Sequence, residues 1–340
     1  MKNLKFAIVN SSSYGKHFPE HIDRLKRLGE VLIVNVPQDI KSLELASKLQ
    51  GIHGIVASVT PRFDSICLSA CNDLILLARH GIGCDNVDLA SATELGIMVS
   101  RVKGEVEQES VAEMAVGLAL SGSRFMHAGY EAVKSSRWKD RANFLGPELG
   151  GKIIGILGLG NIGSRVAEIM SLGFKSEVIA CDPYLSENEI IKRHARKVTF
   201  DQLIETADLI SFHCPLTKET GRIFSSNVFS RLKHGVVLVN TCRGELLDED
   251  ALIDALACGR VRSYATDVVE GEPIDGNHRL LEFPNVLITP HLGGYSDESL
   301  YGMGQTMVDD IEAVFRNGEK PGLLANPDVY NSSKLRTFKF

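Results

Sequence analysis

The stretch KIIGILGLGNIGSRVAEIMSLGFKSEVIACD, residues 152–182, decides the predicted fold. It holds an apolar run at 153–157, the turn GLGNIG at 158–163, a helical segment, a second apolar run at 178–181, and then Asp182. Strand, glycine turn, helix, strand and acid in this order are typical of a dinucleotide-binding unit. A glycine-rich turn without a ligand is the alternative, but the complete series favours a nucleotide site.

Each glycine of this turn has a physical role in such a unit. Gly158 permits the tight turn, Gly160 lets the backbone approach a pyrophosphate, and Gly163 lets the helix pack close to the strand. The phosphates would bind to the free N–H groups at the helix N-terminus. Asp182 comes 19 residues after Gly163. A carboxylate there accepts hydrogen bonds from a ribose 2′-OH and repels a 2′-phosphate, which predicts NAD rather than NADP.

Bulk properties narrow the class of protein. The chain has 340 residues, 44% of them hydrophobic, and a net charge of −6, which argues against a nucleic-acid or anionic-membrane partner. The first apolar run is too short for a signal peptide, and no run is long enough for a transmembrane helix. Seven scattered cysteines without a C-x-x-C pair predict a cytoplasmic protein with neither disulfides nor a metal site.

Short apolar runs alternate with helical patterns along most of the chain. In the first 103 residues we expect strands at 6–9, 31–36, 54–57, 74–78 and 97–100 and helices at 20–28, 42–49, 64–70 and 88–94. After the glycine turn, further strands are expected at 209–213, 236–240, 263–268 and 286–289. This alternation predicts an α/β protein with two doubly wound parallel sheets. No strand of the first half precedes a phosphate-type turn.

Three other segments show patterns that bear on packing or on oligomer contacts. Residues 107–123 are apolar on most sides, which predicts a helix buried in a core or in an oligomer interface. Trp138 lies in a polar stretch predicted to be a loop, as a surface anchor or as a dimer contact. Apolar residues between 300 and 315 form one helical stripe. The remaining residues, about twenty, are too few for another domain.

Three polar residues follow consecutive predicted strands: Arg243, Glu272 and His291. Doubly wound sheets bind ligands at such strand ends. Hydride transfer to a 2-keto acid needs a guanidinium for the carboxylate and keto oxygen, an acid such as His, and a carboxylate that favours the protonated His. Taken singly, the three could be a surface arginine, a turn residue and a packed histidine.

Other reactive residues have weaker cases. His213 ends a strand near the predicted cofactor, where it could pack or hydrogen-bond locally, and His80 could face a substrate from a glycine-rich loop. Cys242 is either a redox-sensitive thiol or a small residue beside the nicotinamide.

Taken together, the motifs resemble those of the D-isomer-specific 2-hydroxyacid dehydrogenases, over about residues 55–314. The resemblance rests on GIGCDNVD at 81–88, SVAE at 110–113, GLGNIG at 158–163, HCPLT at 213–217, NTCRG at 240–244, DVVEGEP at 267–273 and TPHLGG at 289–294. It is strongest to members similar to phosphoglycerate dehydrogenases and hydroxypyruvate reductases that have no C-terminal regulatory domain.

The resemblance implies a flavodoxin-like substrate domain, residues 1–103 and 297–340, and a Rossmann NAD domain, residues 104–296, with a cleft between them. It implies that Arg243, Glu272 and His291 are catalytic, with His291 as the proton donor, and that Asp267 lies near the nicotinamide amide. The implied cofactor contacts are Gly158, Gly160, Asn161, Ile162, Gly163, Asp182, Cys214, Pro215, Thr217, Thr241, Cys242, Arg243, Asp267, His291, Gly293 and Gly294. The implied substrate contacts are Ser58, Val59, the backbone N–H groups of Ile82 and Gly83, Arg243 and His291.

The resemblance also implies a small 2-keto or 2-hydroxy acid as substrate and a homodimer formed through the NAD domain. Arg62 does not match the basic residue that relatives use for phosphorylated substrates, and Glu272 stands where formate dehydrogenases have glutamine. Phosphite dehydrogenases share the trio. A different class of function is an NAD-sensing co-repressor, whose dehydrogenase fold serves to bind protein partners.

Overall fold

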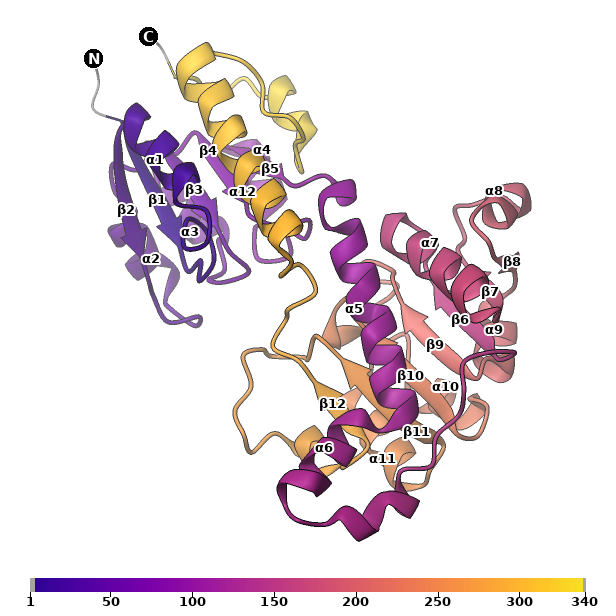
Figure 1. Ribbon diagram of the computed structural model, residues 1–340. Helices are drawn as coiled ribbons and strands as arrows, with labels where there is room; N and C mark the ends of the chain where they lie inside the picture. Colours follow the sequence, from indigo (N-terminus) through magenta and orange to yellow (C-terminus); the bar gives the residue numbers. More distant parts are fainter. Residues whose placement is uncertain (1–3, 339–340) are drawn as a thin grey trace. The chain divides into compact units, whose positions relative to one another are not determined.

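The computed structural model describes residues 4–338. The chain divides into two compact units, one made of Met1–Glu107 with Tyr295–Phe340 and the other of Gln108–Gly294. Each unit is a parallel β-sheet with helices packed against its faces (Figure 1). Within residues 4–338, no helix has both the length and the apolar character that crossing a membrane requires.

The first unit contains a five-stranded sheet with the strand order β2-β1-β3-β4-β5. Flavodoxin-like sheets have this order, so the prediction of a flavodoxin-like unit is confirmed. The strands are β1 Lys5–Val9, β2 Glu30–Val34, β3 Gly54–Ala57, β4 Leu76–Arg79 and β5 Met98–Arg101. The helices between them are α1 Pro19–Leu28, α2 Ser42–Lys48, α3 Ser65–Ala70 and α4 Leu89–Glu94.

The central strands of this sheet are continuous buried runs. Every residue of β3 and β4 is buried, as expected where helices cover both faces of a parallel sheet. Asp64 and Asp88 begin α3 and α4 by accepting the N–H of Cys67 and Ser91. β4 ends in Arg79, which is only 4% exposed. Charged side chains are rarely buried to this extent.

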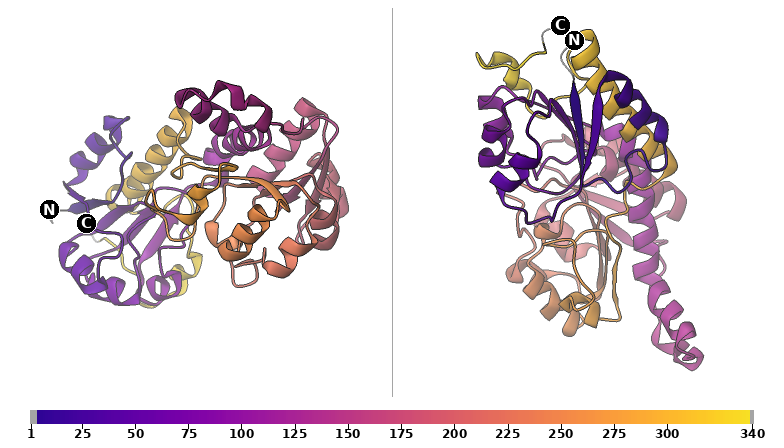
Figure 2. Two further views of the ribbon diagram at one scale, coloured as in Figure 1. Left: turned by 90° about the horizontal axis from the view of Figure 1, so that it is seen from below. Right: turned by 90° about the vertical axis from the view of Figure 1, so that its left-hand side faces the viewer.

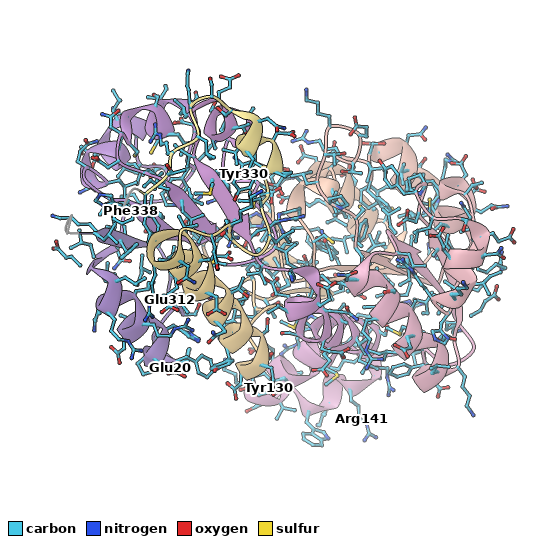
Figure 3. All side chains as sticks on the ribbon, turned by 90° about the horizontal axis from the view of Figure 1, so that it is seen from above. Glu20, Tyr130, Arg141, Glu312, Tyr330 and Phe338 are labelled. Carbon is cyan, nitrogen blue, oxygen red and sulfur yellow. The ribbon has the colours of Figure 1, made fainter. Side chains whose placement is uncertain are left out.

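Helix α12, Asp297–Glu312, belongs to the first unit and continues as the π-helical turn η5, Ala313–Asn317. Its apolar stripe is buried against the five-stranded sheet, and the ring of Phe315 meets that of Phe6 edge-on at 5.3 Å. Arg24 of α1 donates to Glu312 at 2.6 Å. Figure 3 labels Glu20 on α1 and Glu312 on the neighbouring α12.

The segment after α12 is fastened to the same sheet by side-chain amide and guanidinium groups. Asn326 accepts the N–H of Val99 at 2.9 Å and donates to the carbonyl of Ile97 at 3.0 Å. Arg336 donates to the carbonyls of Leu95 and Cys71. A short 3-10 turn, η6 Pro327–Asn331, lies in this segment. The C-terminal segment, which is far in sequence from the strands of this sheet, therefore completes the first unit.

The second unit contains a seven-stranded sheet with the order β12-β11-β10-β9-β6-β7-β8. From β8 this is the Rossmann order 3-2-1-4-5-6 with one further strand, which confirms the Rossmann prediction. The strands are β6 Ile153–Leu157, β7 Glu177–Cys181, β8 Arg196–Lys197, β9 Leu209–Phe212, β10 Val236–Asn240, β11 Val261–Thr266 and β12 Val286–Ile288. The helices are α7 Asn161–Glu168 with the π-helical turn η2 Ile169–Gly173, α8 Glu187–Lys192, α9 Phe200–Thr206, α10 Ser226–Arg231 and α11 Glu249–Ala257, with 3-10 turns η3 Gly244–Leu246 and η4 Arg279–Glu282.

Helix α5, Gly104–Arg124, contains the predicted apolar helix of residues 107–123. Ala112, Ala115 and Ala119 are buried in one cluster with residues of β6 and β10. The side of α5 that carries them is thus part of a core. The chain then forms α6, Met126–Lys134, and the 3-10 turn η1, Trp138–Asn143. The sequence prediction missed α6 and assigned a loop where η1 lies. Figure 2 shows α6 projecting from its unit at the end of α5.

Candidate active site

The glycine turn of the second unit has the geometry that a dinucleotide requires. Gly158 follows β6 with φ of +87°, and a Cβ there would lie 2.8 Å from the backbone N of Cys214. A Cβ on Gly163 would lie 2.2 Å from the carbonyl oxygen of Gly158. A Cβ on Gly160 would meet nothing within 4 Å. The protein itself therefore requires Gly158 and Gly163, whereas the open side of Gly160 is available to a ligand.

Asp182 follows β7 and braces this turn. Its Oδ2 accepts the N–H of Leu159 at 2.9 Å, and its Oδ1 accepts the N–H of Tyr184 at 2.9 Å. A carboxylate has about four acceptor positions, so each oxygen retains one for a ribose hydroxyl. Arg193 donates to the carbonyl of Leu159, so both backbone polar groups of Leu159 are held by side chains.

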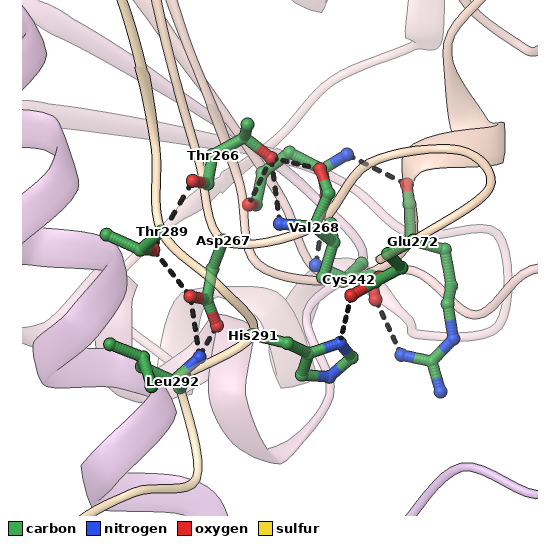
Figure 4. A network of polar contacts seen from close by, with 11 residues as sticks. Cys242, Thr266, Asp267, Val268, Glu272, Thr289, His291 and Leu292 are labelled. Atoms are coloured by element: carbon green, nitrogen blue, oxygen red, sulfur yellow. Dashed lines mark hydrogen bonds and ion pairs between the residues drawn. The ribbon is translucent and has the colours of Figure 1, made fainter. Parts of the chain in front are cut away.

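His291 and Glu272 are in direct contact. The His291 Nδ1 lies 2.9 Å from the Glu272 Oε2, and the two side chains are 33% and 31% exposed (Figure 4). With Nδ1 bonded to a carboxylate, the His291 Nε2 remains for a reacting group. Arg243 follows β10, which is next to β11 in the sheet. Its Nη1 donates to the carbonyl of Cys242 at 2.6 Å, and its own carbonyl accepts from Asn240.

Asp267, only 2% exposed, organises the segment that carries His291. Its Oδ1 accepts the Thr289 hydroxyl at 2.5 Å and the Leu292 N–H at 2.7 Å, while Oδ2 accepts the Gly293 N–H at 2.6 Å (Figure 4). The backbone of His291 has φ of +55°, and its N–H bonds to the carbonyl of Asp267. Left-handed backbone is unfavourable for a histidine, so these bonds offset a local cost.

Similarity to known proteins agrees with this geometry. Residues 116–293 match the family model described as D-isomer specific 2-hydroxyacid dehydrogenase, NAD binding domain. The hydroxypyruvate reductase of Thermotoga maritima is 35% identical over 270 residues, which cover 79% of this chain and 86% of that protein. The chain belongs to the D-isomer specific 2-hydroxyacid dehydrogenases. This family consists of NAD-dependent oxidoreductases, and the second unit is its NAD-binding domain.

Two more similar proteins define the extent of the similarity. The D-3-phosphoglycerate dehydrogenase of Archaeoglobus fulgidus is 34% identical over 292 residues, 86% of this chain but 54% of that protein. The chain thus spans about half the length of that relative. The crystal structure of D-lactate dehydrogenase from Aquifex aeolicus, complexed with NAD and lactic acid, has a TM-score of 0.82 and 27% identity. The match covers 94% of this chain and 99% of that chain.

Several coenzyme residues implied by the family lie at the end of β9 or β10. Cys214 and Pro215 follow β9 beside Gly158, whereas the hydroxyl of Thr217 is engaged within its own turn, with Glu219 at 2.7 Å. The buried hydroxyl of Thr241 has no hydrogen-bond partner within residues 4–338, which suits a group that contacts coenzyme. Gly293 and Gly294 end the segment that carries His291.

Cys242 and His213, which follow these strands, are partly buried. Burial raises the pKa of the Cys242 thiol, which donates to the carbonyl of Phe212 at 3.0 Å. A thiol that stays protonated is a poor nucleophile, so the structure favours the small-residue interpretation of Cys242. Burial lowers the pKa of His213 to about 3, and its Nε2 bonds with the Ser211 hydroxyl at 2.8 Å. His213 thus makes a local hydrogen bond, as the sequence suggested.

The substrate residues that the family implies lie partly in the first unit. Ser58 and Val59 follow β3, and Ile82 and Gly83 follow the neighbouring strand β4, so both pairs are at the carboxyl edge of the five-stranded sheet. The Ser58 carbonyl accepts from Asn86 at 3.1 Å, and Val59 is exposed. Their part in substrate binding, like that of the trio in catalysis, stays a prediction.

Proposed function

We propose that this chain is an NAD-dependent 2-keto acid reductase and 2-hydroxy acid oxidase of D specificity. The contact between His291 and Glu272, at the coenzyme edge of an NAD-binding sheet, is the observation that supports this function most directly. When bound, NAD supplies the hydride acceptor or donor at nicotinamide C4, which exchanges a hydride with C2 of the substrate. We assign coenzyme binding to the second unit, together with the substrate contacts of Arg243 and His291, and the remaining substrate contacts to the first unit.

The trio has separate tasks in this proposal. The His291 Nε2 delivers a proton to the substrate oxygen as the keto group is reduced and takes it back during oxidation. Glu272 holds Nδ1, which fixes the orientation of the ring and leaves Nε2 to face the substrate. The Arg243 guanidinium grips the carboxylate and polarises the keto oxygen, because its planar fork matches both.

The Asp267 carboxylate has a positioning task that the sequence did not reveal. It accepts three hydrogen bonds from the Thr289–Gly293 segment, so about one acceptor position remains for the nicotinamide amide. We assign it first to the conformation of the His291 segment and second to the coenzyme. A carboxylate in the middle of a loop can impose such a conformation because it accepts from several N–H groups at once.

The test is a panel of 2-keto acids with NADH: glyoxylate, hydroxypyruvate, pyruvate, bulky keto acids and 3-phosphohydroxypyruvate. We expect turnover with at least one of them, measured by loss of NADH absorbance. Arg62 is exposed and is not expected to favour the phosphorylated acid. No turnover with any acid, together with NAD-dependent association, would contradict the proposal and support a protein-binding module instead.

We also propose that the chain forms a homodimer through the second unit. The segment from α6 to residue 145 exposes several large apolar side chains, among them Trp138 at 69%, Tyr130 and Leu145. A cluster of exposed aromatic and aliphatic groups is typical of a protein interface. Light scattering coupled to size exclusion should give the mass of two chains, and Trp138→Asp should lower it. A monomeric wild type would exclude this interface.

We propose a reducing compartment, the cytoplasm, as the location, because the seven cysteines are scattered along the chain without a C-x-x-C pair.

A further inference from the structure

The carbonyl groups at the start of the loop after β4 are all engaged in hydrogen bonds. The four carbonyls from Arg79 to Ile82 each accept a hydrogen bond from within the first unit. The donors are, in order, the Gly81 N–H at 2.9 Å, the Arg79 Nη1, the Val102 N–H at 3.2 Å and the Arg101 Nη1 at 3.4 Å. Two of the four donors are guanidinium groups. The loop backbone is therefore held through its carbonyl groups.

Two backbone N–H groups of the same loop, in contrast, are not engaged in hydrogen bonds in the described part of the chain. Within residues 4–338, the N–H groups of Ile82 and Gly83 have no hydrogen-bond acceptor, and both residues are partly exposed. Successive backbone N–H groups without an internal acceptor can form a concave site for an anion. The carbonyls from Arg79 to Ile82 already accept hydrogen bonds, so their negative ends are engaged within the unit.

The two arginines are neighbours in the sheet. Arg79 ends β4, Arg101 ends β5, and the two are directly paired in the parallel register. Their guanidinium groups reach successive parts of the loop, and Arg79 is almost wholly buried. Two positive charges behind a short loop raise the electrostatic potential at its N–H groups, and in the partly buried setting this effect is screened less than at a surface.

Gly81 is adapted to the same arrangement. Its φ is +141°, and a Cβ at this position would lie 2.8 Å from the Arg79 Nη1. A side chain would therefore be strained by the backbone and would push the guanidinium off the His80 carbonyl. The sequence of the loop, with glycine between His80 and Ile82, depends on the arginine beneath it.

We propose that Arg79 and Arg101 are positioning residues that make the loop Gly81–Gly83 a binding site for a small carboxylate anion. They act by holding the loop carbonyls and by adding positive charge behind its N–H groups. This inference rests on the proposed function only in taking that anion to be the carboxylate of the 2-keto acid.

The first experiment measures binding without turnover. The full chain, labelled with ¹⁵N at glycine, is titrated with oxamate, a carboxylate that cannot be reduced as a keto acid is, and with neutral acetamide as a comparison. The Gly83 amide signal, identified by its loss in Gly83→Ala, should move with oxamate and not with acetamide. Arg79→Met and Arg101→Met should weaken the oxamate affinity by about 10- to 100-fold, the usual effect of losing a hydrogen bond to a charged group.

The second experiment uses turnover. Both variants should raise KM for the best keto acid by about the same factor, with a smaller change in kcat and an unchanged affinity for NADH. Arg→Lys at either position keeps the charge but not the fork, so it should fall between wild type and Arg→Met. Arg27→Met is the matched control, because Arg27 is an exposed arginine of the same unit. It should leave KM and oxamate affinity unchanged.

The outcomes separate the two proposals. Folded variants that bind oxamate as wild type does, with unchanged KM, would overturn the role of the arginines while leaving the reductase intact. Oxamate binding at Gly83 that depends on both arginines, without turnover of any keto acid, would support the anion site and refute the reductase. If Arg79→Met does not fold, the partly exposed Arg101 gives the same test through Arg101→Met, with circular dichroism as the check on folding.

Discussion

The carboxyl edges of the two sheets present polar groups of different kinds. On the seven-stranded sheet they are ionisable side chains: Glu272 and His291 touch and are each about one third exposed. On the five-stranded sheet the charged side chain of Arg79 is buried, and the partly exposed groups are the backbone N–H groups of Ile82 and Gly83. Both sheets are parallel and doubly wound, so the difference comes from the loops and not from the architecture.

This difference matches two chemical tasks. Proton transfer needs a side chain that can change its charge, and burial removes that ability. Burial lowers the pKa of His80 to about 3, with further repulsion from Arg79 and His21, and burial raises the pKa of Tyr14. Neither group changes charge near neutral pH. Fixed N–H dipoles suit anion binding at any pH, whereas the partly exposed pair of Glu272 and His291 suits acid–base work.

Loss of the proton donor should therefore give the largest effect. His291→Ala is expected to lower kcat by about 10²- to 10⁴-fold, the usual contribution of a general acid. Binding of NADH, followed by its fluorescence, should persist, since the glycine turn and Asp182 are unchanged. His80→Gln is the comparison on the five-stranded sheet and should cost far less in kcat. Equal losses of kcat in the two variants would contradict the proposed difference between the carboxyl edges of the two sheets. Unchanged turnover in His291→Ala would exclude His291 from the mechanism.

The sequence predicted best those features that depend on neighbours in the chain. The turn at Gly158 was predicted because a left-handed residue after a strand and before a helix requires glycine, and the structure has φ of +87° there. Continuous apolar runs predicted buried parallel strands such as β10. Helix α6 was missed because its apolar side chains, including Met126 and Tyr130, are exposed and give no pattern that faces a core.

Features that depend on distant contacts were not predicted. Asp267 was assigned to the coenzyme alone, because its bonds to Thr289 and Gly293 join residues 22 and 26 positions apart. Arg79 is not among the predicted site residues, although the sequence holds one signal for it. It ends the run Leu76–Arg79, in which every other residue is apolar, and a charged residue that continues a buried strand needs partners. Which carbonyl it reaches depends on the loop conformation, which the sequence does not give.

A change at the coenzyme side of the seven-stranded sheet should have an intermediate effect. Asp182→Ala removes the predicted acceptor for the ribose 2′-OH and also the brace on the Leu159 N–H. We expect NADH affinity to fall by about 10- to 100-fold, as for loss of a charged hydrogen bond. NADPH affinity should change less, because the repulsion of its 2′-phosphate is lost as well.

The measurement is the ratio of the NADH and NADPH dissociation constants before and after the change. Glu187→Ala, at an exposed position in the following helix α8, is a control that removes a nearby acidic charge without touching the turn. An identical ratio in Asp182→Ala and wild type would refute the ribose assignment.

The smallest effect concerns stability and applies to both units. His80 and His213 each have a folded pKa of about 3, below the ordinary value of 6.5, mainly because burial disfavours the charged ring. The unfolded chain therefore binds more protons, so stability is full above pH 6.5 and is lost as pH falls toward 3. At pH 5.5 each of the two imidazoles should lower the free energy of unfolding by about 1 kcal/mol relative to pH 7.5. Denaturant unfolding at pH 7.5 and 5.5 should show a smaller loss in His213→Gln than in wild type, while the exposed His17→Gln should lose as much as wild type. A loss in His213→Gln equal to that of wild type would show that this ring takes up its proton without unfolding.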